Sequence, residues 1–245
     1  MALSLSQERI DLAATLRLAV RFDLHEGIDN HFSYAPPEGD GRFLVSPYGL
    51  HWSEVRASDI LLIDQAGHVL EGDPAMYETS AFTIHSQIHR QHPRAAWVLH
   101  SHMPYATALT AIESGRLEPV HQNSLRFYGD VAYDEDYNGI SCDIEEGARI
   151  AGTLGDKRIL FMANHGVVVI GASAAEAFND LYYLERACQV QLLAMQSGWP
   201  LKVIGDNTAR PTAASFQEVT ERRAPHIHFA ALKRLLDRDE PGYAE

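Results

Sequence analysis

Cysteine, positive charge and long apolar runs are scarce in this sequence, and each scarcity excludes a class of protein. Only Cys142 and Cys188 occur, far apart and without a Cys-x-x-Cys spacing, so neither a disulfide scaffold nor a thiolate zinc site is expected. Lys and Arg number 20 against 33 Asp and Glu, a formal net charge of −13. Nucleic acids and anionic lipid surfaces bind basic protein surfaces, so we expect neither as a partner.

Apolar runs are short throughout the chain. None reaches the roughly 20 residues of a transmembrane helix. The first twenty residues carry Glu8, Arg9, Asp11 and Arg17 within an amphipathic pattern, whereas a signal peptide needs an uninterrupted apolar core. We therefore expect a cytoplasmic protein.

The 245 residues, 46% of them hydrophobic, provide enough apolar surface for a sizeable core. Strand-sized segments separated by turn residues dominate the first seventy residues after an amphipathic helix from Ser6 to about Leu24. Further on, helical patterns alternate with apolar strand patterns. We expect helices at 79–91, 104–113, 144–154, 173–196 and 229–238, and strands at 95–100, 120–124, 158–163 and 167–170. This mixture predicts one α/β domain around a mostly antiparallel sheet with helices outside.

The stretch Ala95–Ala111 combines a buried-strand pattern with two histidines. The apolar run ends at Leu99, and His100 and His102 follow at a spacing of two. Residues two apart in an extended chain project from the same face, so both imidazoles aim at one point. Pro104 then suits the first turn of a helix. Strand, paired histidines and helix start are the layout of a metal site.

A third histidine stands in a similar position. The apolar strand pattern after Phe161 breaks at Asn164-His165-Gly166 and resumes at Val167. Asn and Gly are turn residues, so a tight connection between two strands would place His165 at a strand end. Three histidines with one open coordination position are typical of a catalytic rather than a structural zinc site.

Several of these motifs together resemble the class II aldolase/adducin family. They are HSHMPYATAL from His100, the NHG turn at Asn164, the SPYGL turn at Ser46 and the amphipathic first helix, in consistent order over roughly residues 5–200. The resemblance implies a three-layer α/β/α sandwich with a mostly antiparallel central sheet over residues 1–200. A C-terminal tail, 201–245, would follow, with a short helix packed on the same domain or on a neighbouring subunit of a homotetramer.

The same resemblance assigns the metal ligands and an activity. His100, His102 and His165 match the three metal-binding histidines of the family, with zinc expected first and manganese or iron as alternatives. The implied activity is a carbon–carbon lyase, of the aldolase or decarboxylase type. Its substrate would be a small hydroxyketone or an oxo or hydroxy acid, which reacts through a metal-stabilised enediolate.

Two alternatives stay open. The first is a three-histidine non-haem iron oxygenase, because the same ligands suit Fe(II). The second is a non-catalytic, adducin-like assembly module. Structural adducin-type members lack the histidine triad, so its retention here favours an enzyme.

The sequence departs from the family pattern at the catalytic glutamate. Counted back from His100, that position is Ala81, and the nearest carboxylate is Glu78. An offset of three residues keeps Glu78 on nearly the same helix face if the segment is helical there. Glu78 is therefore the candidate base. The alternative is an acidic side chain that only stabilises the helix N-terminus.

The phosphate pocket implied by the resemblance is altered as well. Gly49, Thr79 and Ser80 match the small and hydroxyl-bearing positions that bind phosphate in the aldolases, whereas His31 and Tyr48 stand where an asparagine and a threonine are expected. Two bulky rings would fill part of that pocket, so a non-phosphorylated substrate becomes an option. Alternatively, both rings pack inward as core. The substrate class stays open.

Other histidines carry weaker signals. His85 lies on the expected helix 79–91, where it would pack or hydrogen-bond beneath the site, as buried histidines usually do. His226 and His228 repeat the spacing of two. On a helix, however, two such residues diverge by about 200°, so we expect no second metal site there.

Overall fold

The computed structural model describes residues 6–140, 143–218 and 223–245, and Cys142 lies outside them. Its described residues form an eight-stranded sheet in the order β4-β3-β2-β1-β5-β8-β7-β6. Neighbouring strands pair antiparallel throughout, except that β6 and β7 are parallel. The strands are β1 His31–Tyr34, β2 Phe43–Val45, β3 Leu61–Ile63, β4 Val69–Glu71, β5 Trp97–Ser101, β6 Val131–Asp134, β7 Ile159–Met162 and β8 Gly166–Gly171.

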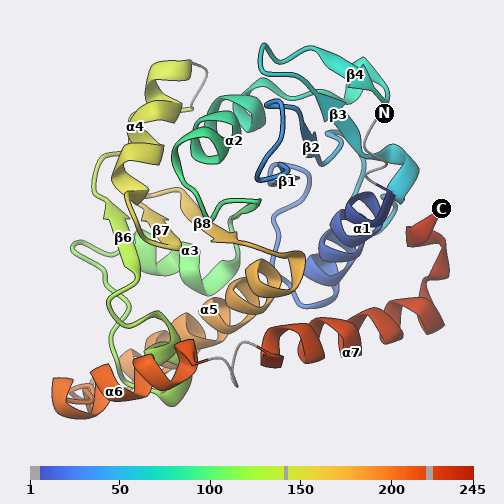
Figure 1. The fold of residues 1–245 in the computed structure, drawn as a ribbon. Helices are drawn as coiled ribbons and strands as arrows, with labels where there is room; N and C mark the ends of the chain where they lie inside the picture. The colour runs from blue at the N-terminus through green and yellow to red at the C-terminus, as the bar shows by residue number, and fades with distance from the viewer. Residues whose placement is uncertain (1–5, 141–142, 219–222) are drawn as a thin grey trace.

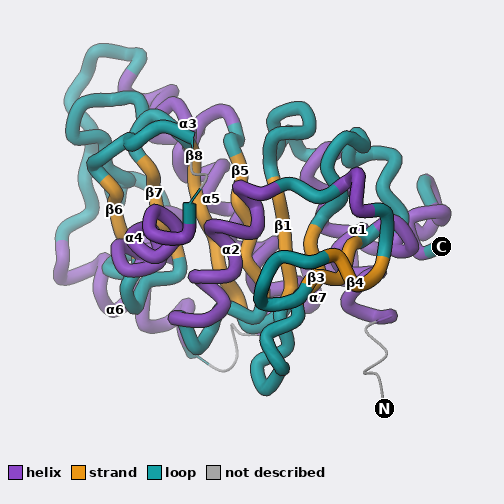
Figure 2. The backbone as a smooth tube through the Cα atoms, turned by 90° about the horizontal axis from the view of Figure 1, so that it is seen from above, coloured by secondary structure: helices purple, strands orange, loops and turns teal. Residues whose placement is uncertain are grey.

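Helices cover both faces of this sheet (Figures 1 and 2). Those with apolar side chains in one core are α1 Ser6–Arg21, α3 Pro104–Thr110, α5 Ala174–Met195 and α7 Arg223–Asp239. A separate core holds α2 Thr79–Gln91 and α4 Ile144–Leu154 against the other face. The three-layer α/β/α sandwich expected from the sequence is thereby confirmed. No described helix is both long and apolar enough to cross a membrane.

Strand alternation decides which side chains face α2. In β5, Trp97 and Leu99 pack in the core with α1 and α5, whereas Val98 packs with α2 and α4. His100 is two residues beyond Val98 and so lies on the α2 side. The central strands β5 and β8 are covered on both faces, which is why each reads as an apolar run rather than as an alternating pattern.

Local capping signals explain where two helices begin. The Asp143 carboxylate accepts a hydrogen bond from the backbone N–H of Glu146 at 2.8 Å, and α4 starts one residue after Asp143. The Ser173 hydroxyl accepts from the N–H of Glu176 at 3.2 Å at the start of α5. Side-chain caps of this kind satisfy N–H groups that have no partner within the helix. The expected helices at 144–154 and 173–196 are confirmed to within a residue.

One expectation for the middle of the chain was wrong, and one strand was missed. The strand expected at 120–124 is instead a 3₁₀ helix, η3 Gln122–Phe127. There the Ser124 hydroxyl donates to the His121 carbonyl at 2.7 Å, a local bond that competes with strand pairing. β6 was not expected; it joins the sheet only through its long-range parallel pairing with β7.

The described residues from 201 onward contain two α-helices, α6 Asp206–Gln217 and α7, and a 3₁₀ helix, η4 Pro241–Ala244, where one helix was expected. α7 contacts the first helix, since the Lys233 ammonium lies 2.6 Å from the Asp11 carboxylate. The Glu245 carbonyl accepts a hydrogen bond from the N–H of Ser58 at 2.8 Å. The C-terminal segment thus packs beside α1 (Figure 1).

Candidate metal centre

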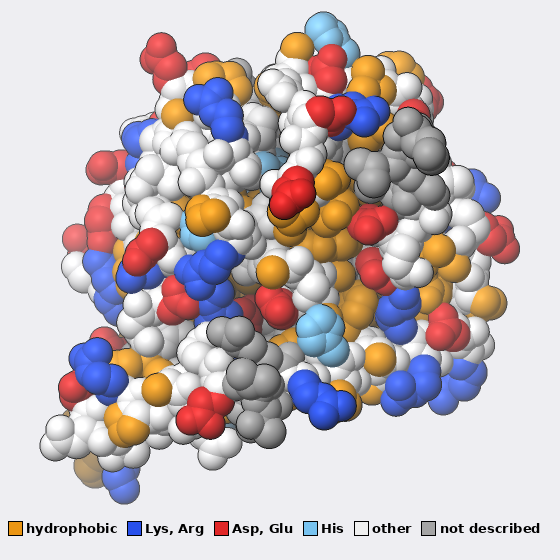
Figure 3. Space-filling view, in the orientation of Figure 1, with side chains coloured by type: hydrophobic (Ala, Val, Ile, Leu, Met, Phe, Trp, Pro, Cys, Tyr) orange, Lys and Arg blue, Asp and Glu red, His pale blue; other side chains and the backbone are white. Residues whose placement is uncertain are grey.

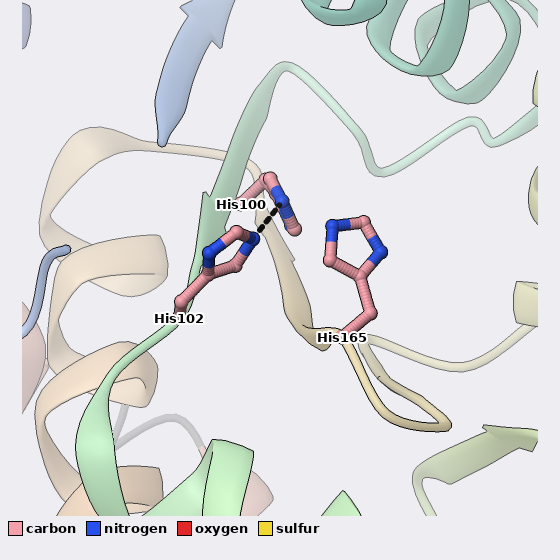
Figure 4. Close-up of side chains that lie close together, drawn as sticks. All are labelled: His100, His102 and His165. Atoms are coloured by element: carbon pink, nitrogen blue, oxygen red, sulfur yellow. Dashed lines mark hydrogen bonds between the residues drawn. The ribbon is translucent and has the colours of Figure 1, made fainter. Parts of the chain in front are cut away.

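Three histidines from two distant segments converge at the end of β5 (Figure 4). His100 belongs to β5, His102 follows the strand, and His165 lies in the turn between β7 and β8. The ring centroids are 4.8 to 4.9 Å apart in all three pairs. One nitrogen of each ring lies within 4.8 Å of the others, and among the described residues these three form the cluster with metal-ligand spacing.

Hydrogen bonds on the outer nitrogens orient two of these rings. The Nδ1–H of His100 donates to the Val167 carbonyl at 3.1 Å, and the Nδ1–H of His102 donates to the Glu26 carboxylate at 2.9 Å. In a neutral imidazole the other nitrogen, Nε2, then carries a lone pair. A histidine that donates its outer N–H to a carboxylate or carbonyl is the usual metal-ligand arrangement.

The inner nitrogens fit a cation. Nε2 of His100 and Nε2 of His102 lie only 3.0 Å apart, the contact dashed in Figure 4. Two lone pairs at this distance repel each other unless a positive charge lies between them. Zinc binds imidazole nitrogens at about 2.0–2.1 Å, so two tetrahedral ligands lie about 3.3 Å apart. The donor set of three imidazoles therefore suits a divalent metal ion.

The backbone of the β7–β8 turn places His165. Asn164 adopts the left-handed region with φ 54°, which Asn tolerates better than most residues. At Gly166 a Cβ atom would lie 2.6 Å from the Ser101 carbonyl and 2.7 Å from the His102 ring, so only glycine fits. The tight turn expected from Asn164-His165-Gly166 is confirmed.

Burial keeps the His100 and His165 rings uncharged. It lowers the pKa of His165 to about 4, helped by the neighbouring His102 and opposed by Asp134. It also lowers the pKa of His100 well below its usual value. Neutral imidazoles are the form that binds metals.

A cavity of about 400 Å³ opens over the three histidines. Of the residues predicted to bind substrate or act as base, His31, Tyr48, Glu78 and Ser80 line it. Gly49 follows Tyr48 in the turn after β2, and Thr79 begins α2, but neither residue is part of the cavity wall. A volume of this size suits a small-molecule ligand.

Glu78 is the N-cap of α2 as well as part of the cavity wall. Its carboxylate accepts from the N–H of Ser80 at 3.0 Å, from the N–H of Ala81 at 2.8 Å and from the Ser80 hydroxyl. Burial alone would raise the pKa of Glu78, but these hydrogen bonds outweigh it and the pKa is lowered. Ala81, where the family resemblance led us to expect a catalytic glutamate, is buried beside the cavity.

His31 is the partner of His100 across the β1–β5 pairing, and their ring centroids lie 4.7 Å apart. Its side chain is buried, yet it reaches the cavity wall. Burial lowers the pKa of His31 to about 4, and Glu78 only partly opposes this. The ring is therefore neutral.

Two residues near the site were missed by the sequence analysis. Glu26 holds His102 as described above. Asn30 lines the cavity; its Oδ1 accepts from the N–H of Glu26 at 2.7 Å and of His102 at 3.3 Å, so the amide orientation is determined. The Nδ2 group of Asn30 is buried without a protein partner. Neither residue belongs to a recognisable motif, so no sequence signal could have found them.

The second His-x-His pair forms no such site. His226 and His228 lie within α7, where helical spacing separates them, as expected. His228 Nδ1 lies 3.2 Å from the Asn179 amide oxygen, and His226 is exposed. On the face drawn in Figure 3, acidic and basic side chains are interspersed.

Comparison with known proteins identifies the same family as the sequence motifs. The profile of the "Class II Aldolase and Adducin N-terminal domain" matches residues 10–192. A Caulobacter vibrioides protein named "Putative aldolase class 2 protein" is 35% identical over 245 residues, 98% of this chain and 92% of that protein. Mouse alpha-adducin is 36% identical over 94% of this chain, which spans only 33% of the adducin.

Solved structures agree in fold. A Pseudomonas syringae protein described as an aldolase II superfamily protein superposes with a TM-score of 0.90 and 31% identity, covering 100% of this chain and 98% of that one. The L-fuculose 1-phosphate aldolase of Glaciozyma antarctica has a TM-score of 0.84 and 26% identity, over 96% and 91% of the two chains. The profile match, the relatives and the structures together show that this chain belongs to the class II aldolase and adducin N-terminal domain family.

Proposed function

We propose that this protein is a divalent-metal-dependent carbon–carbon lyase of the aldolase or decarboxylase type. Its substrate would be a small hydroxyketone or an oxo or hydroxy acid. The observation that carries the proposal is the convergence of His100, His102 and His165 beneath a cavity of about 400 Å³. Three protein ligands leave a coordination position of the metal open for water or substrate, as in catalytic metal sites.

Each residue of the site would have a separate role. His100, His102 and His165 would hold the ion, with zinc the first expectation, and Glu26 would orient His102. A bound divalent ion supplies Lewis acidity that stabilises the enediolate left when a carbon–carbon bond breaks. We also propose that the enzyme is cytoplasmic and assembles as a homotetramer.

Glu78 is the proposed base. It lines the cavity, and its lowered pKa keeps it ionised near neutral pH. A carboxylate has about four acceptor sites, and three donors already bind Glu78, so one site would be left to accept a substrate proton. Ser80, Tyr48 and His31 would contact substrate from the wall, while Gly49 and Thr79 stay predicted substrate residues.

A non-catalytic assembly module is the second candidate. It is favoured by Ala81, which removes the family's catalytic carboxylate, and by the 36% identity to mouse alpha-adducin. A protein of that kind needs neither bound metal nor turnover.

The deciding experiment measures metal content and bond cleavage together. Protein purified anaerobically is analysed for zinc, manganese and iron, and then tested with a panel of hydroxyketones and hydroxy acids. Oxygen uptake with aromatic 2-oxo acids tests the iron oxygenase. We expect one divalent ion per chain and cleavage without oxygen uptake.

The matched variants are His102→Ala and His226→Ala, each of which removes one histidine of a His-x-His pair. Only His102→Ala should lose metal and cleavage, because His226 is exposed in α7. Metal-free wild-type protein with no turnover would favour the assembly module and refute the lyase.

A further inference from the structure

A line of hydrogen-bonded polar side chains runs from the cavity into the layer between the sheet and α2. His31 Nδ1 lies 2.7 Å from His85 Nε2, and His85 Nδ1 contacts the Ser33 hydroxyl. Ser33 Oγ lies 2.7 Å from His89 Nε2, and His89 Nδ1 lies 2.6 Å from the Ala95 carbonyl. Side chains beneath a site that are joined in one line act on each other's protonation.

The carbonyl at the end of the line determines its direction. A carbonyl only accepts, so the Nδ1 of His89 carries the hydrogen, and its Nε2 accepts from the Ser33 hydroxyl. The Ser33 oxygen then accepts from the Nδ1–H of His85, which leaves the Nε2 of His85 as an acceptor. His31 must therefore donate through Nδ1, and its Nε2 carries a lone pair.

These hydrogen-bond directions require neutral imidazole rings, and the surroundings of the rings favour the neutral form. His85 is fully buried, and its partners are His31 and Ser33, neither of which is a carboxylate. A buried imidazolium without a counter-charge is costly. Burial lowers the pKa of His85 well below its usual value and that of His89 to about 4.

The described cavity wall offers an anion neutral donors, such as the Ser80 hydroxyl and the Asn30 amide, rather than a cationic side chain. Among the described residues that line it there is no Lys or Arg, while Asp29 and Glu78 are both acidic. A phosphate carries −1.5 to −2 charges near neutral pH and offers only acceptors. It would meet the lone pair of His31 and the carboxylate of Glu78, and like groups repel.

We propose that His31 binds a hydroxyl group of the substrate through its Nε2 lone pair, and that the site thereby selects an unphosphorylated polyhydroxy compound over its phosphate ester. His85, Ser33 and His89 are positioning residues that hold His31 in this tautomer. The substrate preference rests on the proposed metal-dependent function, whereas the tautomer of His31 does not depend on that function.

The first experiment measures the tautomer directly. Long-range ¹⁵N–¹H correlation spectra of the metal-free, histidine-labelled full chain distinguish a nitrogen with a lone pair from one that carries hydrogen. We expect lone pairs on Nε2 of His31 and of His85 and hydrogen on both Nδ1 atoms. The variants His31→Asn and His85→Gln assign the signals. In Ser33→Ala, which breaks the line, the His31 and His85 signals should shift toward a mixture of tautomers.

The second experiment measures ligand preference. Zinc-loaded protein is titrated calorimetrically with dihydroxyacetone and with dihydroxyacetone phosphate, which differ only at one hydroxyl. The wild type should bind the unphosphorylated compound more tightly. His31→Asn should shift the ratio of the two Kd values by about tenfold toward the phosphate, because one hydrogen bond is lost and an amide N–H can donate. The control His68→Asn, an exposed histidine, should leave the ratio unchanged.

Several results would overturn the proposal. Hydrogen on Nε2 of His31 in the wild type refutes it without any variant. A Kd ratio that is the same in His31→Asn and wild type refutes the specificity role. A changed visible spectrum of cobalt-substituted His31→Asn would make His31 a metal ligand instead. Wild-type protein that binds no zinc would refute the proposed function, while the NMR spectra would still decide the tautomer.

Discussion

Glu26 offers a sharp test of the metal centre, because it does not line the cavity over the three histidines and belongs to no motif. Its carboxylate accepts from the Nδ1–H of His102 at 2.9 Å. The substitution Glu26→Gln retains the shape and an acceptor oxygen but removes the charge. We expect weaker metal binding, since a carboxylate on the outer nitrogen makes the inner nitrogen a better ligand.

The magnitude follows from the exposure of the carboxylate. Loss of a partner behind a metal ligand typically costs ten- to a hundredfold in affinity. The Glu26 side chain is 69% exposed, and solvent screens an exposed charge. The effect should therefore lie at the lower end, about tenfold in zinc Kd, or about 1.4 kcal/mol.

The assay is a competition titration of metal-free protein against a chromophoric zinc chelator. Glu38→Gln is the matched control, because it removes the same charge from an exposed turn outside the cavity wall. Cobalt-substituted protein should keep its visible spectrum in both variants, since the three ligands stay in place.

Equal zinc affinities for Glu26→Gln and wild type would show that the contact to His102 does not tune the ligand. An affinity loss equal to that of His102→Ala would also contradict the reasoning, because Glu26 would then be acting as a ligand itself.

Three further predictions concern stability. Gly166→Ala should lower the free energy of unfolding in urea by about 1–3 kcal/mol, because the new Cβ would meet the Ser101 carbonyl. Gly152→Ala should raise it by about 0.5–1 kcal/mol, because the Cβ would enter open space on α4. The opposite order of stabilities would contradict the backbone geometry. Burial raises the pKa of Glu185 from 4.5 to about 7, so between these pH values the folded chain holds a proton that the unfolded chain has lost. The free energy of unfolding should therefore fall by about 3 kcal/mol as the pH rises from about 4.5 to about 7. Urea titrations at a series of pH values should show that Glu185→Gln flattens this dependence. Zinc at about a hundred times its Kd should add about 2.7 kcal/mol to the free energy of unfolding, and EDTA should reverse the accompanying rise in Tm. A Tm that changes with neither zinc nor EDTA would argue against a native metal site.

Local sequence patterns were sufficient for much of the fold. The helices at 79–91 and 144–154 have the bounds expected from their helical sequence patterns. These signals come from neighbours within one or two turns, which the sequence displays directly. The His100-Ser-His102 pair is equally local, because extended geometry predicts both rings on one face, although β5 itself ends at Ser101.

The pairing of strands that are far apart in the sequence could not be predicted from those local patterns. β6 is a strand because it lies beside β7, and residues 120–124 are not a strand because Ser124 bonds locally. Nothing within a few residues of either segment decides between these outcomes.

The sequence by itself determined the ligand types, the two segments that supply them and the helices and strands that carry them. Only the tertiary structure decided that His165 meets His100 across the β5–β8 pairing, that Glu26 holds His102 and that His85 joins His31. These contacts join residues 54 to 76 positions apart. The physical reason is that their geometry is set by the packing of α2 and the register of the sheet, which depend on the whole core rather than on any local pattern.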